Sequence, residues 1–79
     1  MEKAELIEKV NSILSEEFEV ETDVMTPDAN IKQTLQLDSL SIVDMVALIE
    51  NEFGVKIKPA EVSGLTTFGK LYDYIAEHI

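Results

Sequence analysis

The sequence predicts an all-α domain, and three observations lead to this prediction. Apolar residues recur at helical spacing in three segments, about 3–18, 39–52 and 67–78. Residues 55–58 alternate as a strand would, but they have no plausible partner strand, so we interpret them as a loop. The 79 residues suffice for one domain, 1–79, and without cysteine it depends on helix packing. The predicted order is a long helix, a long loop, a second helix, a short third helix and a fourth helix.

The first predicted helix runs from about Lys3 to Phe18. Its apolar residues follow one another mostly at steps of three and four, which places them on one face. They are Leu6, Ile7, Val10, Ile13, Leu14 and Phe18. Glutamates fill many of the positions between them, and we expect these on the solvated face. An amphipathic helix that contributes to the core accounts for the whole segment.

A segment without clear periodicity, Glu19 to Leu37, separates this helix from the next. Pro27 disfavours helix immediately before it, and residues 28–31 suggest a turn. We expect Ile31 and Leu35 to anchor this loop to the core. A loop this long in a small domain is often functional or flexible. The simpler interpretation is that it spans the molecule, so that two helices can run in a chosen direction.

The second predicted helix begins at Ser39 and ends at about Glu52. Asp38 and Ser39 are both residue types that cap a helix start, so we expect the Ser39 hydroxyl at the exposed N-terminal end. The core face consists of Ile42, Met45, Val46, Ile49 and Phe53. A second apolar stripe consists of Leu40, Val43 and Ala47, flanked by Asp44, Glu50 and Asn51. Because a surface helix needs only one apolar stripe, we favour a docking patch with an acidic rim over a second contact within the chain.

The remainder of the chain predicts two more helices. The first is short, from about Pro59 to Val62 or Ser63, with its proline in the first turn. Thr66 or Thr67 then caps the last helix, which ends near the C-terminus. Its apolar stripe consists of Phe68, Leu71, Tyr72, Ile75 and Ile79.

The net charge of −10 restricts the possible partners. Residues 1–53 carry 13 acids and 3 lysines, whereas residues 54–79 carry 3 of each. This charge disfavours nucleic acids and anionic membranes and favours basic protein surfaces. The chain has no apolar run of about 18 residues that would insert into a membrane, and its N-terminus lacks the basic start of a signal peptide. We therefore expect a cytoplasmic monomer, and the start at Met1 favours a free-standing protein over an excised domain.

The sequence offers little for catalysis. The one histidine, His78, is penultimate, which disfavours a Ser-His-Asp arrangement with Ser39. The chain has no glycine-rich phosphate loop and no calcium-loop spacing, and we predict no metal site. A hydroxyl at a helix start suits a phosphate ester, because the free N–H groups and the helix dipole stabilise the anion. Two interpretations of Ser39 remain open on this basis, namely a covalently attached carrier arm and simple phosphorylation.

The motif Asp38-Ser39-Leu40 and its surroundings resemble the acyl carrier proteins. The resemblance runs through essentially the whole chain, and the helix lengths, the long first loop, the charge and the position of the motif make it specific. The other positions that carry it are Asp28-Ala29-Asn30-Ile31, Leu35, Val43, Glu50, Phe53, Ile57 and Leu65-Thr66-Thr67-Phe68.

This resemblance implies a four-helix bundle with a short third helix, which performs no catalysis itself. Ser39 would carry 4′-phosphopantetheine, transferred from coenzyme A by a Mg²⁺-dependent phosphopantetheinyl transferase, and Asp38 would support the attachment. The arm would supply the thiol that the chain lacks and hold acyl groups as thioesters. Partner enzymes with basic surfaces would dock on Leu40, Val43, Asp44, Ala47 and Glu50. The acyl chain would lie among Ile42, Val46, Ile57 and Leu65.

Some positions depart from the family pattern. Gln36 stands where many members have glycine, Ser41 stands where an acid often follows the motif, and Asn51 replaces one acid of the docking face. Lys56 and Lys58 make the region of the third helix less acidic. We therefore expect a carrier of fatty-acid, polyketide or related lipid biosynthesis, with a specialised carrier at least as well supported as a housekeeping one. The alternative is an unmodified acidic adaptor that binds basic partner proteins through the second helix.

Overall fold

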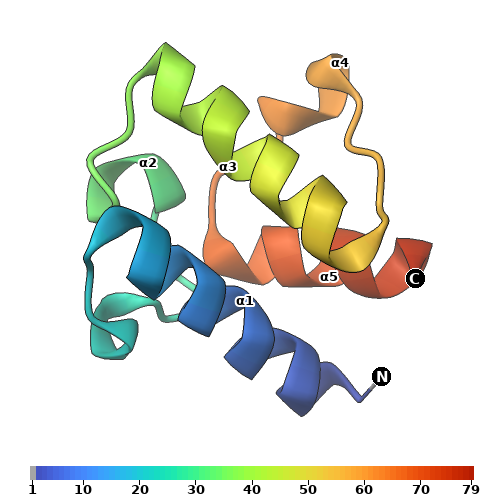
Figure 1. The fold of residues 1–79 in the computed structure, drawn as a ribbon, viewed down its shortest axis with the longest axis horizontal. Helices are drawn as coiled ribbons and strands as arrows, with labels where there is room; N and C mark the ends of the chain where they lie inside the picture. Colours follow the sequence, from blue (N-terminus) through green and yellow to red (C-terminus); the bar gives the residue numbers. More distant parts are fainter. Residues whose placement is uncertain (1) are drawn as a thin grey trace.

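The structure, a computed structural model, describes residues 2–79 (Figure 1). Its elements in chain order are α1 (Lys3–Phe18), the 3₁₀ turn η1 (Thr22–Val24), α2 (Ile31–Thr34), α3 (Ser39–Phe53), α4 (Pro59–Val62) and α5 (Phe68–His78). Among these residues the only β-type pairing is an isolated bridge between Asn30 and Thr67. The predicted all-α class and the four predicted helices are confirmed, with α3 ending one residue later than expected.

The long connection between α1 and α3 is more ordered than predicted. It contains η1 and the four-residue helix α2, two short elements that the prediction of a long loop from Glu19 to Leu37 did not include. The Asn30 side chain caps α2 by accepting a hydrogen bond from the Gln33 N–H at 2.9 Å. A helix of one turn is too short to produce an apolar repeat, which explains why periodicity did not predict it.

Two helix ends have a left-handed residue that is not glycine. Glu19 follows α1 with φ 55°, and Gln36 lies beyond α2 with φ 54°. Gly54, which follows α3, has a similar φ of 68°. Glycine adopts this conformation freely, whereas a residue with a Cβ atom pays about 1–2 kcal/mol for it. Positions 19 and 36 are therefore strained, and position 36 is one where a glycine would suit the backbone.

The core forms mainly between α1 and α5, and α5 runs across the bundle below α3 in the view of Figure 1. The residues with no exposed surface are Leu6, Val10, Leu14, Ile49, Phe68, Leu71 and Ile75. These residues include half of the predicted stripe of the first helix and three of the five residues predicted for the last. The stripe of α3 lies less deeply than expected, because Ile42, Val46 and Phe53 are only half-buried. Ile79 is 51% exposed, so its assignment to the core stripe of the last helix was wrong.

The connection between α1 and α3 is tied to the start of α5. The Ile31 N–H donates to the Thr66 carbonyl at 2.9 Å, and the Gly69 N–H donates to the Pro27 carbonyl at 3.0 Å. These bonds satisfy N–H groups that the first turns of the helices would otherwise leave free. Ile31 and Leu35 are buried, as predicted for anchors. The tie holds α2 beside the segment between α4 and α5, and so fixes the surroundings of the α3 N-terminus.

Candidate attachment site and docking face

The start of α3 is capped by Asp38. One carboxylate oxygen of Asp38 accepts a hydrogen bond from the Ser41 N–H at 2.8 Å, and this bond is the main cause that lowers the pKa of Asp38 below its usual value. The capping role therefore belongs to Asp38, and the Ser39 hydroxyl is not required for it. Ser39 is the first residue of the helix and its side chain is exposed.

Ser39 lies on a well-fixed piece of backbone. Leu37, two residues earlier, is only 5% exposed and anchors the chain to the core. The helical hydrogen bonds begin at once, since the Ile42 N–H donates to the Asp38 carbonyl at 3.0 Å. An exposed hydroxyl is thus held at a defined position at the N-terminus of a 15-residue helix.

A hollow of about 550 Å³ begins at Ser39, and we call it the Ser39 hollow. It lies between α2, α3, α4 and the segment that leads to α5. Its polar rim includes Asn30, Gln33, Ser63 and Thr66. Its apolar walls are formed by Ile31, Leu37, Ile42, Met45, Val46, Val62 and Leu65. A flexible group attached to Ser39 would therefore have an apolar recess with a polar rim next to its point of attachment.

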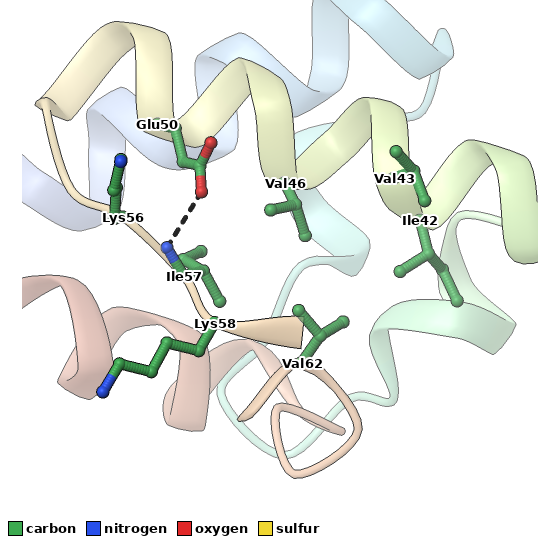
Figure 2. Close-up of a pocket in the computed structure, with 8 residues that line it drawn as sticks. All are labelled: Ile42, Val43, Val46, Glu50, Lys56, Ile57, Lys58 and Val62. Atoms are coloured by element: carbon green, nitrogen blue, oxygen red, sulfur yellow. Dashed lines mark hydrogen bonds between the residues drawn. The ribbon is translucent and has the colours of Figure 1, made fainter. Parts of the chain in front are cut away.

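A second hollow of about 540 Å³ lies between α3 and α4, and we call it the α3–α4 hollow. In Figure 2, Val46, Ile57 and Val62 point into one space, while the Lys58 side chain extends away from it. The two hollows share Ile42, Val46 and Val62 as walls. The four residues that the resemblance assigns to the acyl chain therefore all line one hollow or both.

The predicted docking residues divide into two groups. Leu40 and Val43 are 78% and 64% exposed, and Asp44 and Ala47 are also exposed, so these four form a continuous surface along α3. Glu50 differs, because it is half-buried and its carboxylate accepts a hydrogen bond from the Ile57 N–H at 3.0 Å (Figure 2). Its charge is thereby engaged within the fold, between α3 and the segment that precedes α4.

Sequence reasoning missed two residues of this region and one hydrogen bond. Val62 lines both hollows. It is the last residue of a short helix in which the only other small apolar side chain is Ala60, and this could have predicted that Val62 points inward. Leu37 lines the Ser39 hollow and was assigned only to the loop. The inward bond of Glu50 had no sequence signal, because an acid on a helix surface usually faces solvent.

Other site types find no support in residues 2–79. This part of the chain holds no cluster of three or more histidine, cysteine or acidic side chains placed to bind a metal ion. None of its helices is both long enough and apolar enough to cross a membrane. His78 stacks on Tyr74 with ring centroids 4.2 Å apart, and its Nδ1 lies 2.7 Å from the Tyr74 carbonyl oxygen. This histidine is therefore engaged within its own helix.

Comparison with known proteins identifies the type of site. A family model described as a phosphopantetheine attachment site matches residues 8–75. The acyl carrier protein of Thermotoga maritima is 36% identical over 77 residues, which are 98% of this chain and 95% of that protein. The chain belongs to the acyl carrier protein family. The acyl carrier protein of Rubrobacter xylanophilus is 31% identical over 78 residues, covering 99% of this chain and 96% of that protein.

A solved structure of the acyl carrier protein from Enterococcus faecalis has the same fold. It superposes with a TM-score of 0.84 at 35% identity, and the match covers 100% of both chains. As an acyl carrier protein, this chain carries a covalent phosphopantetheine group and is not an enzyme. The free hydroxyl and the adjoining hollows fit such a group, since a long arm needs an accessible oxygen and a recess beside it.

Proposed function

We propose that Ser39 is the residue that carries 4′-phosphopantetheine and that the chain shuttles acyl groups between biosynthetic enzymes. The proposal is supported by an exposed serine at the start of α3, next to an apolar hollow. Because Asp38 caps this helix, the Ser39 hydroxyl is not needed for capping. Once attached, the arm supplies a terminal thiol that holds the acyl group as a thioester. The domain formed by residues 1–79 supplies no cysteine that could do this.

The attachment step follows from the chemistry of the hydroxyl. The Ser39 oxygen forms a bond to the phosphorus on the pantetheine side of the coenzyme A diphosphate. The bond between that phosphorus and the bridging oxygen breaks, and adenosine 3′,5′-bisphosphate leaves with the electron pair. The hydroxyl proton passes to a base on the transferase. Asp38, which is ionised at neutral pH, would support this step as a carboxylate that helps to hold the metal ion of the transferase.

The two hollows suggest where the acyl chain lies between reactions. An aliphatic chain attached through Ser39 is sheltered from water by Ile42, Val46 and Val62, which line both hollows. Ile57 extends this apolar wall in the α3–α4 hollow, and Leu65 extends it in the Ser39 hollow. Burial of the chain there protects it until a partner enzyme withdraws it.

Partner enzymes dock on the exposed face of α3 under this proposal. Leu40 and Val43 provide the apolar contact, Ala47 continues it, and Asp44 provides a free acidic charge for a basic surface. Glu50 belongs to the lower edge of the same face, but its bond to Ile57 leaves Asp44 as the more available charge. The partners include the phosphopantetheinyl transferase and enzymes that acylate, condense or modify the cargo in the cytoplasm.

The carrier serves fatty-acid, polyketide or a related lipid pathway, and we favour a specialised carrier. Gln36, Ser41 and Asn51 depart from the usual family pattern around the attachment site and docking face. Lys56 and Lys58 are exposed beside α4 and reduce the acidity there. Partner enzymes whose docking surfaces are adapted to this carrier would explain all of these departures.

Mass spectrometry after co-expression with a phosphopantetheinyl transferase tests the attachment. Wild type is expected to gain the mass of one phosphopantetheine, and Ser39→Ala is expected to gain none. Ser41→Ala is the matched control, since it removes a hydroxyl two residues away in the same turn. It is expected to reach the same final mass as wild type, even where the change at this position alters the rate of modification. Modification of Ser39→Ala would exclude the assignment, and a gain of a bare phosphate on Ser39 would favour simple phosphorylation instead.

The exposed face of α3 also suits an adaptor role that does not use the arm, because Leu40 and Val43 are available without it. The two functions differ in what Ser39→Ala does. An adaptor binds its basic partner equally well after this change, whereas a carrier loses transfer of acyl groups. Association measured by surface plasmon resonance, together with an acyl-transfer assay, separates them. In both cases Asp44→Lys is expected to slow association, and added salt is expected to reduce the difference.

A further inference from the structure

Gln36 occupies a backbone position that a glycine would occupy at lower cost. It lies beyond α2 with φ 54°, and the next N–H, that of Leu37, donates to the Lys32 carbonyl at 2.9 Å. This six-residue hydrogen bond is typical of a Schellman motif, in which the left-handed residue is usually glycine. A side chain is therefore retained at a position where it destabilises the fold.

The Gln36 side chain has no hydrogen-bonding role within residues 2–79. It is exposed, and its amide makes no hydrogen bond to any of these residues. Its neighbours Leu35 and Leu37 are both 5% exposed, so the backbone on either side is anchored in the core. The amide is thus attached to a fixed backbone and directed to solvent, three residues before Ser39.

We propose that Gln36 is a specificity residue that contacts the phosphopantetheinyl transferase when Ser39 is modified. This inference rests on the proposed function of Ser39. An enzyme that brings the diphosphate of coenzyme A to the Ser39 oxygen covers the surface around that oxygen, including the turn that precedes Asp38. The amide of Gln36 offers one donor group and one acceptor group without charge. It fits a polar, uncharged hydrogen-bonding group of the transferase, whereas Asp44 acts through long-range attraction.

The chain contains a matched control for the strain. Glu19 has nearly the same φ, 55°, also follows a helix and is also exposed. It lies between α1 and η1 and lines neither hollow. Replacement of either residue by glycine relieves the same backbone strain, but only position 36 adjoins the modified serine in the chain.

The experiment compares Gln36→Gly, Gln36→Ala and Glu19→Gly in thermal unfolding and in steady-state modification by one transferase. Both glycine variants are expected to melt at a higher temperature than wild type. Gln36→Ala keeps the left-handed strain but loses the amide, so its melting temperature is expected to stay near that of wild type. Loss of one hydrogen bond to the enzyme is expected to reduce kcat/KM about three- to tenfold in both Gln36 variants, mainly through KM. Glu19→Gly is expected to keep the wild-type kcat/KM.

Three results would overturn the proposal. If both Gln36 variants are modified with the wild-type kcat/KM, the amide makes no contact with the transferase. If only Gln36→Gly is slowed, backbone freedom and not the amide explains the effect. If wild type itself is not modified at Ser39, the proposed function fails and this inference fails with it, and the intact mass distinguishes that case from the other two.

Discussion

Helices α1 and α5 pack as a closed pair, whereas α3 and α4 line two hollows. Among the side chains that the structure describes, seven of the eight largest fully buried ones lie on α1 and α5, and Ile49 is the one that comes from α3. By contrast, Ala60 and Glu61 of α4 are exposed and Val62 is only half-buried. In Figure 1, α4 lies on the far side of α3 from α1. This difference suggests that α1 and α5 mainly stabilise the fold, whereas α3 and α4 leave room for an attached acyl group.

The largest expected loss of stability tests the packing of α1 against α5. Leu71 of α5 has no exposed surface, so Leu71→Ala leaves a closed cavity and is expected to cost about 2–5 kcal/mol of unfolding free energy. Val62→Ala is the counterpart in the open half. It widens hollows that already exist, so we expect a cost of less than about 1 kcal/mol. Urea unfolding followed by circular dichroism measures both. If both substitutions reduced the free energy of unfolding equally, the surroundings of Val62 would be packed as tightly as the core.

The next largest expected loss of stability tests the hydrogen bonds that join the connection between α1 and α3 to the start of α5. A Cβ atom added at Gly69 would lie 3.1 Å from the Pro27 carbonyl oxygen and 3.4 Å from the Pro27 Cβ. Since that carbonyl also accepts the Gly69 N–H, the backbone has little room to move, and Gly69→Ala is expected to cost about 1–3 kcal/mol.

Gly64, in the open half, is the control for this change. A Cβ atom there would lie 3.4 Å from the Glu61 carbonyl oxygen, which is close to an ordinary contact. Gly64→Ala is therefore expected to be neutral or to stabilise by up to about 1 kcal/mol, because it restricts the unfolded chain. A larger loss of stability in Gly64→Ala than in Gly69→Ala would contradict the comparison of the two halves.

A third effect tests the bond that joins α3 to the segment before α4 within the open half. The Glu50 carboxylate accepts the N–H of Ile57, and Ile57 is only 4% exposed. Glu50→Ala leaves this N–H without a partner and is expected to cost about 1–3 kcal/mol, whereas Glu50→Gln keeps an acceptor and is expected to stay close to wild type. Hydrogen exchange of the Ile57 amide gives the local measurement. Unchanged protection in Glu50→Ala would mean that the bond does not restrain this segment.

The sequence predicted the packed half better than the open half, for a physical reason. Burial of one helix face imposes a repeat of three and four residues, and this repeat identified Leu6, Val10 and Leu14 as well as Phe68 and Leu71. Such a pattern depends only on residues near one another in the chain. The exposure of Leu40 and Val43 also followed from it, since they lie off the buried face of α3.

The missed features arise from contacts between distant residues or from backbone conformation. The Glu50 bond depends on the path of the chain after Gly54, and no local pattern encodes that path. The short helix α2 depends on one capping side chain, Asn30, and not on a repeat. Gln36 was noted as a departure from the family pattern, but only the φ angle explains why a glycine suits that position. The hollow beside Ser39 likewise requires the tertiary arrangement.

The smallest expected effect concerns the acid end of the pH range and the cap of α3. Hydrogen bonding from the Ser41 N–H lowers the pKa of Asp38 below the value of 3.8 for a free side chain. Asp38 therefore stabilises the folded state fully above the unfolded pKa, and this contribution is lost as the pH falls through the lower, folded pKa. Asp38→Asn keeps an oxygen that can cap the helix but does not titrate. We expect the melting temperature of wild type to fall relative to that of Asp38→Asn between about pH 5 and pH 2. A constant difference between the two proteins across this range would show that the cap does not depend on the charge of Asp38, and that a neutral oxygen at this position caps α3 as well as the carboxylate does.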